Sequence, residues 1–479
     1  MQKKFIQNLA LLLTLNLLIK PFWILGIDRA VQQEVGTEAY GLYFAIFNFS
    51  FLLNILLDFG ITNFNNKNIA QNNHLITKHF SSIIVLKLML GVMFMVVMMI
   101  SGFLIGYDSY QLGLLAVMGI NQFLAFMIMY LRSNLAGLHL FKTDSIISVL
   151  DRSLMIIFCS ILLWGNLIEG PFQIEWFIYT QTFSYLLTTG ITFLIVMQKA
   201  KFKRLKWNRP FFFLILKKSF PFAILVLLMT FYNRADTVML ERLLPDGATE
   251  SGIYASAYRL LDASNMISFL FAGLLLPMFS RMLRFKESVE DLVKLAFTIL
   301  ITPAIIITTA CIFYSYDVMN LLYVEHVEES SAVFSILMCC FVAISLTYIF
   351  GTLLTANGNL MQLNIMAASG MVFNLGLNLF LIPKFQAQGA ALSSLITQFG
   401  TAILQIYLVQ RLFKFKVNRR LILQLLIFVP GVLMFAWLSK ILFSNWMIGL
   451  VVMGLASVGL AFLIGLLHIK SMFRILKYG

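Results

Sequence analysis

Long apolar runs, each near the length that crosses a lipid bilayer, follow one another along almost the whole chain. A membrane-spanning helix needs roughly 20 mostly apolar residues, because the hydrocarbon core is about 30 Å thick and offers no water to backbone polar groups. Only 12% of the 479 residues are charged, against about 25% in a soluble domain. The sequence therefore predicts an all-α, polytopic membrane protein.

Fourteen runs reach this length. They cover residues 5–27, 40–63, 81–106, 110–131, 144–165, 172–197, 219–243, 251–276, 292–315, 331–355, 362–383, 387–410, 421–443 and 446–468. The runs at 110–131 and 362–383 carry Gln and Asn and are the weakest of the set. We therefore expect about 14 transmembrane helices.

The basic residues alternate between the two predicted sides of the membrane. Lys and Arg accumulate in short cytoplasmic loops. One side receives Lys3, Lys4, Lys67, Lys78, Arg132, Lys142, the segment KAKFKRLKWNRP, Lys217, Lys218, Arg281, Arg284, Lys286, the segment RLFKFKVNRR, Lys470, Arg474 and Lys477. The other receives Arg29, Arg242, Lys384 and Lys440. This asymmetry predicts that both termini are cytoplasmic.

The net charge of +14 has the same explanation. These charges set topology and suit anionic lipid headgroups, so no nucleic-acid partner is expected. The opening MQKK precedes a long apolar run without a small-residue cleavage site, which is typical of a first span and not of a secretory signal.

No catalytic or metal-binding pattern stands out. The four cysteines lie in predicted spans, and none of the five histidines has zinc-ligand spacing. The sequence also contains no phosphate-binding glycine loop and no nucleophile elbow. We therefore expect no catalytic residues, no metal and no cofactor, and predict that the protein is not an enzyme.

A phrase near the N-terminus returns in the middle of the chain. TEAYGLYFAIF begins at Thr37 and TESGIYASAY at Thr249, so Gly41 aligns with Gly252 and Tyr43 with Tyr254. The copies open the second and eighth predicted spans, and an offset of six helices implies two parallel repeats about an axis along the membrane normal. A shared packing device, in which glycine permits close helix approach, is the alternative explanation.

The repeat defines the predicted domains. An N-terminal six-helix lobe covers 1–198 and a C-terminal six-helix lobe covers 219–410, joined by a basic cytoplasmic linker at 199–218. Residues 411–479 add a basic loop, two extra helices and a cytoplasmic tail.

Three segments carry a family resemblance. They are EVGTEAYGLYFAIFNFSFLLNILLDFGI, NRADTVMLERLLPDGATESGIYASAYRLLDASNMISFLFAGLLLPMFSRM and GTLLTANGNLMQLNIMAASGMVFNLGLNLFLIPKFQAQGAALSSLITQ. Their order and spacing resemble the polysaccharide repeat-unit flippases, of O-antigen type, in the multidrug/oligosaccharidyl-lipid/polysaccharide exporter superfamily. No single motif is specific to that family.

The resemblance implies a flippase of the cell inner (plasma) membrane. Such a protein moves polyprenyl-pyrophosphate-linked oligosaccharides to the outer leaflet for the biosynthesis of O-antigen in lipopolysaccharide, of capsule or of a similar surface polysaccharide. Its expected partners are the lipid-linked oligosaccharide substrate, membrane lipids and other polysaccharide assembly proteins.

Charges inside predicted spans are candidate site residues. Each costs roughly 2.5 to 3.5 kcal/mol on insertion scales, so each requires a partner or a purpose. An anionic diphosphate headgroup needs a cationic cavity. The candidates for substrate binding are Lys20, Lys87, Arg152, Arg234 and Arg259, and those for ion coupling or a gate are Asp58 and Asp236.

A structural role stays open for every candidate. Lys20 precedes Pro21, which removes a backbone donor and is expected to bend the first span. Lys20 and Lys87 are also long enough to reach headgroups outside the cavity. The other candidates have these alternatives: Arg234 and Asp236 as separate links to other helices, Arg259 neutralised by Asp262 at i+3, and Asp58 at a helix end. Arg152 faces away from a stripe of Asp144, Ser148 and Asp151, which is expected to line the cavity or, at its cytoplasmic end, to be solvated.

Two other functions compete with the flippase. A drug or metabolite cation antiporter on the same fold would favour acidic over basic residues in its cavity. A membrane glycan polymerase or ligase would carry a large outer loop or clustered catalytic carboxylates, and the outer loops predicted here are short.

Overall fold

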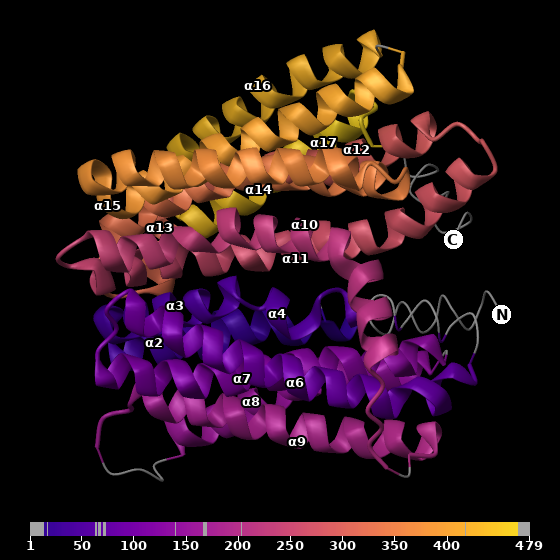
Figure 1. Ribbon diagram of the computed structural model, residues 1–479. Coiled ribbons are helices and arrows are strands. Elements are labelled where there is room, and N and C mark those ends of the chain that lie inside the picture. The colour runs from indigo at the N-terminus through magenta and orange to yellow at the C-terminus, as the bar shows by residue number, and fades with distance from the viewer. Residues whose placement is uncertain are drawn as a thin grey trace. The chain divides into compact units, whose positions relative to one another are not determined.

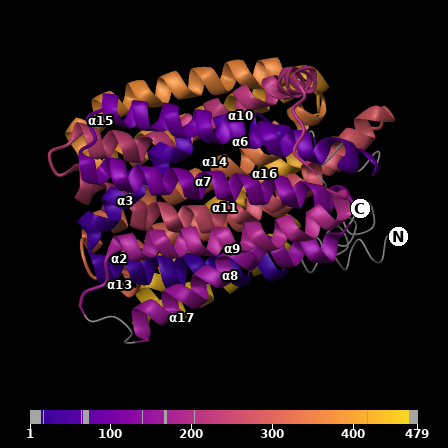
Figure 2. The same cartoon turned by 60° about the horizontal axis from the view of Figure 1, so that its bottom comes forward.

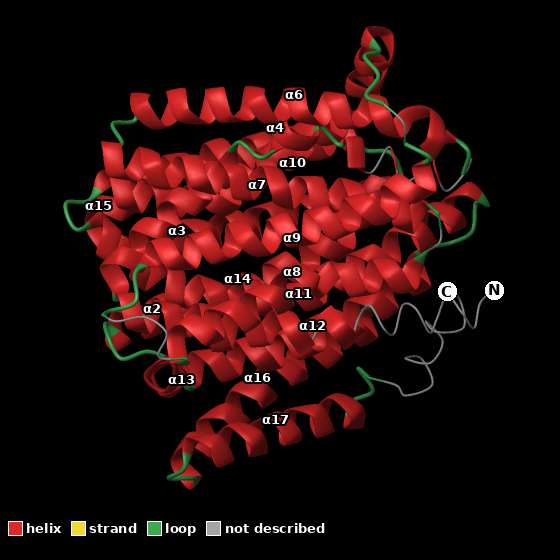
Figure 3. Ribbon diagram, turned by 90° about the horizontal axis from the view of Figure 1, so that it is seen from below, coloured by secondary structure: helices red, strands yellow, loops and turns green. Residues whose placement is uncertain are grey.

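A computed structural model describes residues 14–467, apart from 17, 63, 64, 66–68, 70–72, 139, 166–169, 203 and 417. Within these residues the chain forms helices and no strand (Figure 3). Ten described helices are long and apolar enough to cross a membrane by length and composition. The all-α, multi-pass prediction is therefore confirmed.

The chain divides into two compact units. Unit 1 is Met1–Arg242 with Asp246–Gly252, and unit 2 is Leu243–Pro245 with Ile253–Gly479. Unit 1 contains the π-helix η1 (Trp23–Asp28), α2 (Arg29–Val35), α3 (Thr37–Leu52), α4 (Ile55–Asp58), α6 (Leu75–Leu104), α7 (Ser109–Gly137), α8 (Phe141–Trp164), α9 (Ile174–Ala200) and nearly all of α10 (Arg209–Leu243).

Helix α7 lies at the centre of unit 1. It packs against α3, α6, α8 and α9 (Figures 1 and 2). A capping box opens it: the Asp108 carboxylate accepts from the backbone N–H of Gln111, and the side-chain oxygen of Gln111 accepts from the backbone N–H of Asp108. These bonds satisfy orphan donors at the helix start, so the helix begins sharply after the α6–α7 turn.

Unit 2 is built on α14. It contains most of α11 (Gly247–Arg284), then α12 (Glu290–Phe313), α13 (Ser315–Leu322), α14 (Val327–Ala356), α15 (Leu360–Phe413), α16 (Arg419–Leu442) and α17 (Trp446–Leu463). Helix α14 packs against α12, α13 and α15.

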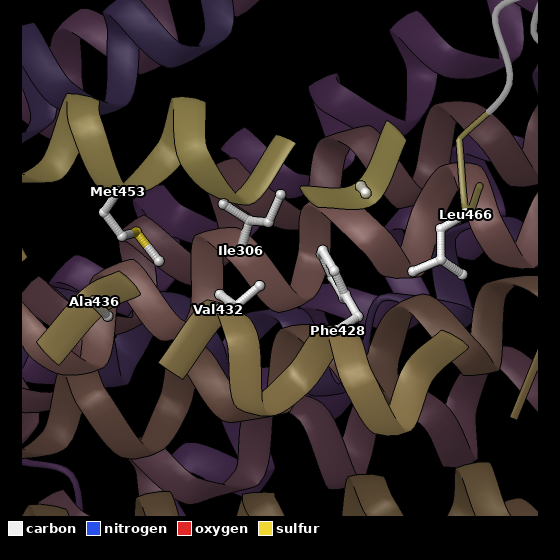
Figure 4. Packing of buried hydrophobic residues seen from close by; sticks show 7 residues of the cluster. Ile306, Phe428, Val432, Ala436, Met453 and Leu466 are labelled. Carbon is white, nitrogen blue, oxygen red and sulfur yellow. The ribbon is translucent and has the colours of Figure 1, made fainter. Parts of the chain in front are cut away.

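The last two helices pack together on α12 (Figure 4). Their contact consists of buried apolar side chains: Ile306, Phe428, Val432, Ala436, Met453, Ala461 and Leu466. Lys440 Nζ donates to the Phe313 carbonyl at 2.7 Å, and the Tyr314 and Ser439 hydroxyls lie 2.7 Å apart. One face of the pair is therefore fixed on α12, whereas many of its other side chains are exposed, as expected for helices in lipid.

The count of fourteen spans stays a prediction. Helix α15 is counted once among the ten, although its 54 residues are interrupted at Gln386, where φ is 51° and ψ is −131°. An uninterrupted helix of that length would extend about 80 Å, far beyond the hydrocarbon core. The second predicted span is broken between α3 and α4, α11 is not among the ten, and the first span lies partly outside the described residues.

The predicted lobe boundaries also stay a prediction. The division into compact units places α10 up to Arg242 in unit 1, whereas the sequence repeat predicts that residues 219–243 belong to the C-terminal lobe. Contacts explain the assignment to unit 1. On α10, Arg234 donates a hydrogen bond to Asn48 on α3. Arg242 donates one to the Gly106 carbonyl after α6.

The two copies of the repeated phrase pack against each other within unit 1. A Cβ added at Gly41 would overlap the carbonyl oxygen of Ala248, and one added at Gly252 would overlap that of Thr37. Glycine therefore permits the backbone of α3 to touch the first turn of α11. The Gly-x-Tyr phrase has a packing role at both of its occurrences.

Replacing Gly41 by Ala is expected to lower the midpoint of thermal unfolding in detergent. Overlap with backbone atoms cannot be relieved by a rotamer change, and overpacking costs about 1 to 3 kcal/mol. The matched controls are Gly113→Ala on α7 and Gly190→Ala on α9, where an added Cβ meets no described atom within 4 Å. A helical Ala stabilises by roughly 0.5 to 1 kcal/mol over Gly, so an unchanged or higher midpoint for Gly41→Ala would contradict the close contact.

Candidate functional site

The helix that carries Lys20 and Pro21 changes its winding after Phe22. Residues 18–22 are helical, and the six residues Trp23–Asp28 that follow form the π-helix η1. The bend expected at Pro21 stays a prediction, and the structure shows a π-helical turn that follows the proline. π turns occur frequently at functional sites. The Leu17 carbonyl, which Pro21 would leave without a donor, lies outside the described residues.

Arg152 lies between aromatic rings at the middle of α8, as the twelfth of its 24 residues. Its Cζ is 5.5 Å from the centre of the Trp23 ring and 5.8 Å from that of Tyr185. Trp23 in turn stacks on Phe177 at 5.7 Å, with 3° between the ring planes. Three elements, η1, α8 and α9, thus position one guanidinium group.

Lys20 adds a second positive charge to this group. Its ammonium is within electrostatic range of Arg152, Asp151 and Arg132. Asp151 Oδ2 lies 3.7 Å from Arg152 Nε, which offsets one of the nearby positive charges. Among the residues that the structure describes, Lys20 has no hydrogen-bond or ion-pair partner. The cationic cluster is defined here as Lys20, Arg152, Asp151, Trp23 and Tyr185.

The polar stripe predicted on α8 has partners within unit 1. Arg132 Nε donates to Asp144 Oδ1 at 2.8 Å, and its Nη2 lies 3.4 Å from Oδ2. Asn16 Nδ2 donates to Ser148 Oγ at 3.0 Å. Asn16 was not among the residues predicted from the sequence, although its position four residues before Lys20 puts both on one helix face. That the stripe lines a cavity stays a prediction.

Lys87 and Asp58 were assigned separate roles, and the structure brings them together. The Lys87 ammonium pairs with the Asp58 carboxylate and donates to the Leu57 carbonyl at 3.0 Å. The Lys87 side chain is only 2% exposed, and its Nζ lies 5.8 Å from the centre of the Tyr130 ring. The pair links the end of α4 to α6. Substrate contact by Lys87 and a gate at Asp58 stay predictions.

Arg234 and Asp236 lie on α10 in different environments. Arg234 is half-buried, with Nη1 donating to Asn48 Oδ1 at 3.4 Å and Cζ 5.3 Å from the centre of the Phe51 ring. Asp236 is buried. Two positions apart on a helix, they face different sides, as expected from sequence. Their proposed roles in binding and coupling stay predictions.

Arg259 and Asp262 are half-buried on α11 in unit 2. The substrate contact predicted for Arg259 and its neutralisation by Asp262 both stay predictions. The structure does bring two of the predicted cations, Lys20 and Arg152, within electrostatic range of each other.

A cluster around Arg242 was not predicted from the sequence. The Arg242 Cζ lies 4.0 Å from the centre of the Tyr107 ring, and its Nη2 donates to Gln111 Oε1 at 3.2 Å. Burial, and then the Glu241 carboxylate, raises the pKa of the Tyr107 hydroxyl. The sequence showed Arg242 only as an isolated charge in a short loop. These contacts join the α6–α7 turn to the end of α10.

Solved transporter structures share the fold. The lipid II flippase MurJ in an inward closed conformation superposes with a TM-score of 0.73 at 14% identity, covering 93% of this chain and 98% of that chain. An inward-facing multidrug resistance MATE family transporter superposes with a TM-score of 0.67 at 15% identity, covering 85% of this chain and 98% of that chain. A MOP superfamily transporter from Pyrococcus furiosus superposes with a TM-score of 0.65 at 15% identity, covering 86% of this chain and 96% of that chain. Identities this low show the fold alone.

No curated protein sequence matches the chain. The sequence profile of one family does match, over residues 5–283, and its description is polysaccharide biosynthesis protein. That match takes in unit 1 with the cationic cluster and continues through nearly all of α11. The chain therefore belongs to the polysaccharide biosynthesis protein family, as its three sequence segments predicted.

Proposed function

We propose that the protein is a flippase or exporter for polyprenyl-pyrophosphate-linked oligosaccharide repeat units. It moves them across the cytoplasmic membrane by alternating access, for the biosynthesis of O-antigen, capsule or a similar surface polysaccharide. The family match and the shared MurJ and MATE fold support transport of this kind. The observation that carries the substrate class is the cationic cluster of unit 1.

The cluster suits a diphosphate because of its charge. Lys20 and Arg152 carry two positive charges against one from Asp151, and each lies in a chain segment predicted to be in hydrocarbon. Electrostatic interactions are stronger at low dielectric than in water, so these cations attract an arriving anion more strongly than they would in water. The anion also relieves the repulsion between the two cations. The planar donor fork of Arg152 matches phosphate oxygens, and the ammonium of Lys20 acts as a second point charge.

The remaining parts of the proposal come from the sequence predictions. The prenyl tail stays in lipid, while the headgroup and sugars pass through the protein. The protein acts in the inner membrane with both termini in the cytoplasm, beside other polysaccharide assembly proteins. Proton or sodium coupling at Asp58 or Asp236 belongs to the same proposal, and unchanged transport after collapse of both gradients would refute that part.

A drug or metabolite cation antiporter is the second candidate. It is supported by the buried carboxylate of Asp28, which accepts from Tyr40 Oη at 2.8 Å within unit 1. A carboxylate with aromatic neighbours is suited to an organic cation. The multidrug resistance MATE transporter with the same fold adds to this case.

The test uses purified protein in liposomes with a labelled polyprenyl-pyrophosphate oligosaccharide on the inner leaflet. We expect the protein to accelerate exposure of the label to a membrane-impermeant reagent, relative to protein-free liposomes. A parallel set of liposomes contains a fluorescent organic cation and a proton or sodium gradient. Transport of the cation without exposure of the labelled lipid would replace the flippase by the antiporter.

A further inference from the structure

Residues 199–217, which comprise the end of α9, the connection at 201–208 and the first turns of α10, are attached to the start of α6. The Ser81 hydroxyl donates to the Arg204 carbonyl. The His79 ring stacks on Phe211 with centres 4.3 Å apart and 10° between planes. Phe202 meets Phe80 at 5.9 Å in an edge-to-face contact. Three contacts along ten residues fix the position of this connection, which Figure 1 shows between α9 and α10.

The opposite face of the segment is exposed. Leu205 and Trp207 are 53% and 57% exposed, and Phe213 at the start of α10 is 76% exposed. Trp207 is nevertheless held in place, because its ring meets the buried Phe212 edge-to-face at 5.6 Å. The linker surface is defined as the exposed side chains of Arg204, Leu205, Lys206, Trp207, Arg209 and Phe213.

The charge of the segment has one sign. Residues 199–217 contain no acidic residue, and their basic residues are Lys199, Lys201, Lys203, Arg204, Lys206, Arg209 and Lys217. Arg209 lies with Cζ 6.0 Å from the centre of the Trp207 ring. Cations and exposed apolar rings therefore alternate on a surface that adjoins the ends of membrane-spanning helices.

We propose that the linker surface binds anionic phospholipid headgroups of the cytoplasmic leaflet and anchors the start of α10 at the interface. Trp and basic side chains are enriched at this depth of the bilayer, where a ring meets acyl chains and a cation meets phosphate. A polybasic segment is attracted to an anionic leaflet, and salt screens that attraction. Fixed attachment to α6 lowers the ordering cost of binding. This inference does not depend on which substrate is transported.

The test measures which lipids contact Trp207. Purified protein is placed in nanodiscs of phosphatidylcholine with phosphatidylglycerol, and acyl-chain bromine on one lipid class at a time quenches nearby tryptophan fluorescence. The Trp207 signal is the difference between the wild type and Trp207→Phe. At equal mole fraction, we expect brominated phosphatidylglycerol to quench this signal about threefold more than brominated phosphatidylcholine, with the excess lost at high salt.

A matched pair of triple variants locates the effect. Arg204→Gln with Lys206→Gln and Arg209→Gln should abolish the phosphatidylglycerol excess. The control, Lys414→Gln with Lys416→Gln and Arg420→Gln, removes the same charge from the second basic loop and should retain it.

Two results would overturn the proposal. Equal quenching by the two lipids would show contact without headgroup preference. Absence of Trp207 quenching would show that the surface faces water or a soluble partner. Thermal unfolding of every variant checks that it is folded.

Discussion

Replacing Arg152 by Ala is expected to reduce transport of the lipid-linked oligosaccharide at least about tenfold, because a hydrogen bond to a charged group contributes about 1.5 to 3 kcal/mol. The guanidinium is already oriented by Trp23 and Tyr185. The transport rate of Arg152→Lys should lie between those of the wild type and Arg152→Ala, because lysine keeps the charge but loses the planar fork and the stacking. Lys20→Ala should act in the same direction, and the double variant should lose less than the sum if both groups bind one headgroup.

The rate of label exposure in liposomes measures this effect. The matched control is Arg132→Ala, because that guanidinium is already bound to Asp144, and its transport should stay within about twofold of the wild type. Equal losses in Arg152→Ala and Arg132→Ala would show that the cationic cluster holds the helices together and does not bind substrate. Unfolding midpoints measured beside the rates separate a folded, inactive variant from a damaged one.

Removing one partner of the Lys87–Asp58 pair is expected to produce the largest loss of stability. Both side chains are nearly inaccessible, at 2% and 13% exposure. A buried charge left without its partner costs about 3 to 5 kcal/mol. Lys87→Met and Asp58→Asn should each lower the midpoint of thermal unfolding in detergent by about 3 to 5 °C.

The double variant Lys87→Met/Asp58→Asn should recover much of this loss, because it leaves no unpaired buried charge. A double variant no more stable than either single variant would contradict the pairing. Arg132→Met changes an ion pair whose arginine is 26% exposed. It should lower the midpoint of thermal unfolding less than Lys87→Met or Asp58→Asn does. If the stable double variant also fails to transport, Lys87 or Asp58 has the functional role predicted from sequence in addition to the structural one.

The sequence by itself determined the class of protein and its family. Hydrocarbon leaves a backbone few options, so an apolar run near 20 residues forms a helix whatever its neighbours are. The runs at 81–106 and 144–165 became α6 and α8, with ends shifted by a few residues. The three motif segments identified the family that the profile confirms. The Gly41 and Gly252 phrases were also visible as a repeat.

Only the tertiary structure decided which polar side chains meet. Lys87 and Asp58 are 29 residues apart, and Asn16 and Ser148 are 132 apart. Trp23 reaches Arg152 through η1, a π-helical turn that the apolar pattern does not encode. An apolar run requires a helix but leaves its rotation about its axis open. Helix packing sets that rotation, and with it whether each intramembrane charge meets a partner, as Lys87 does, or remains available to a ligand, as Lys20 does within the described chain.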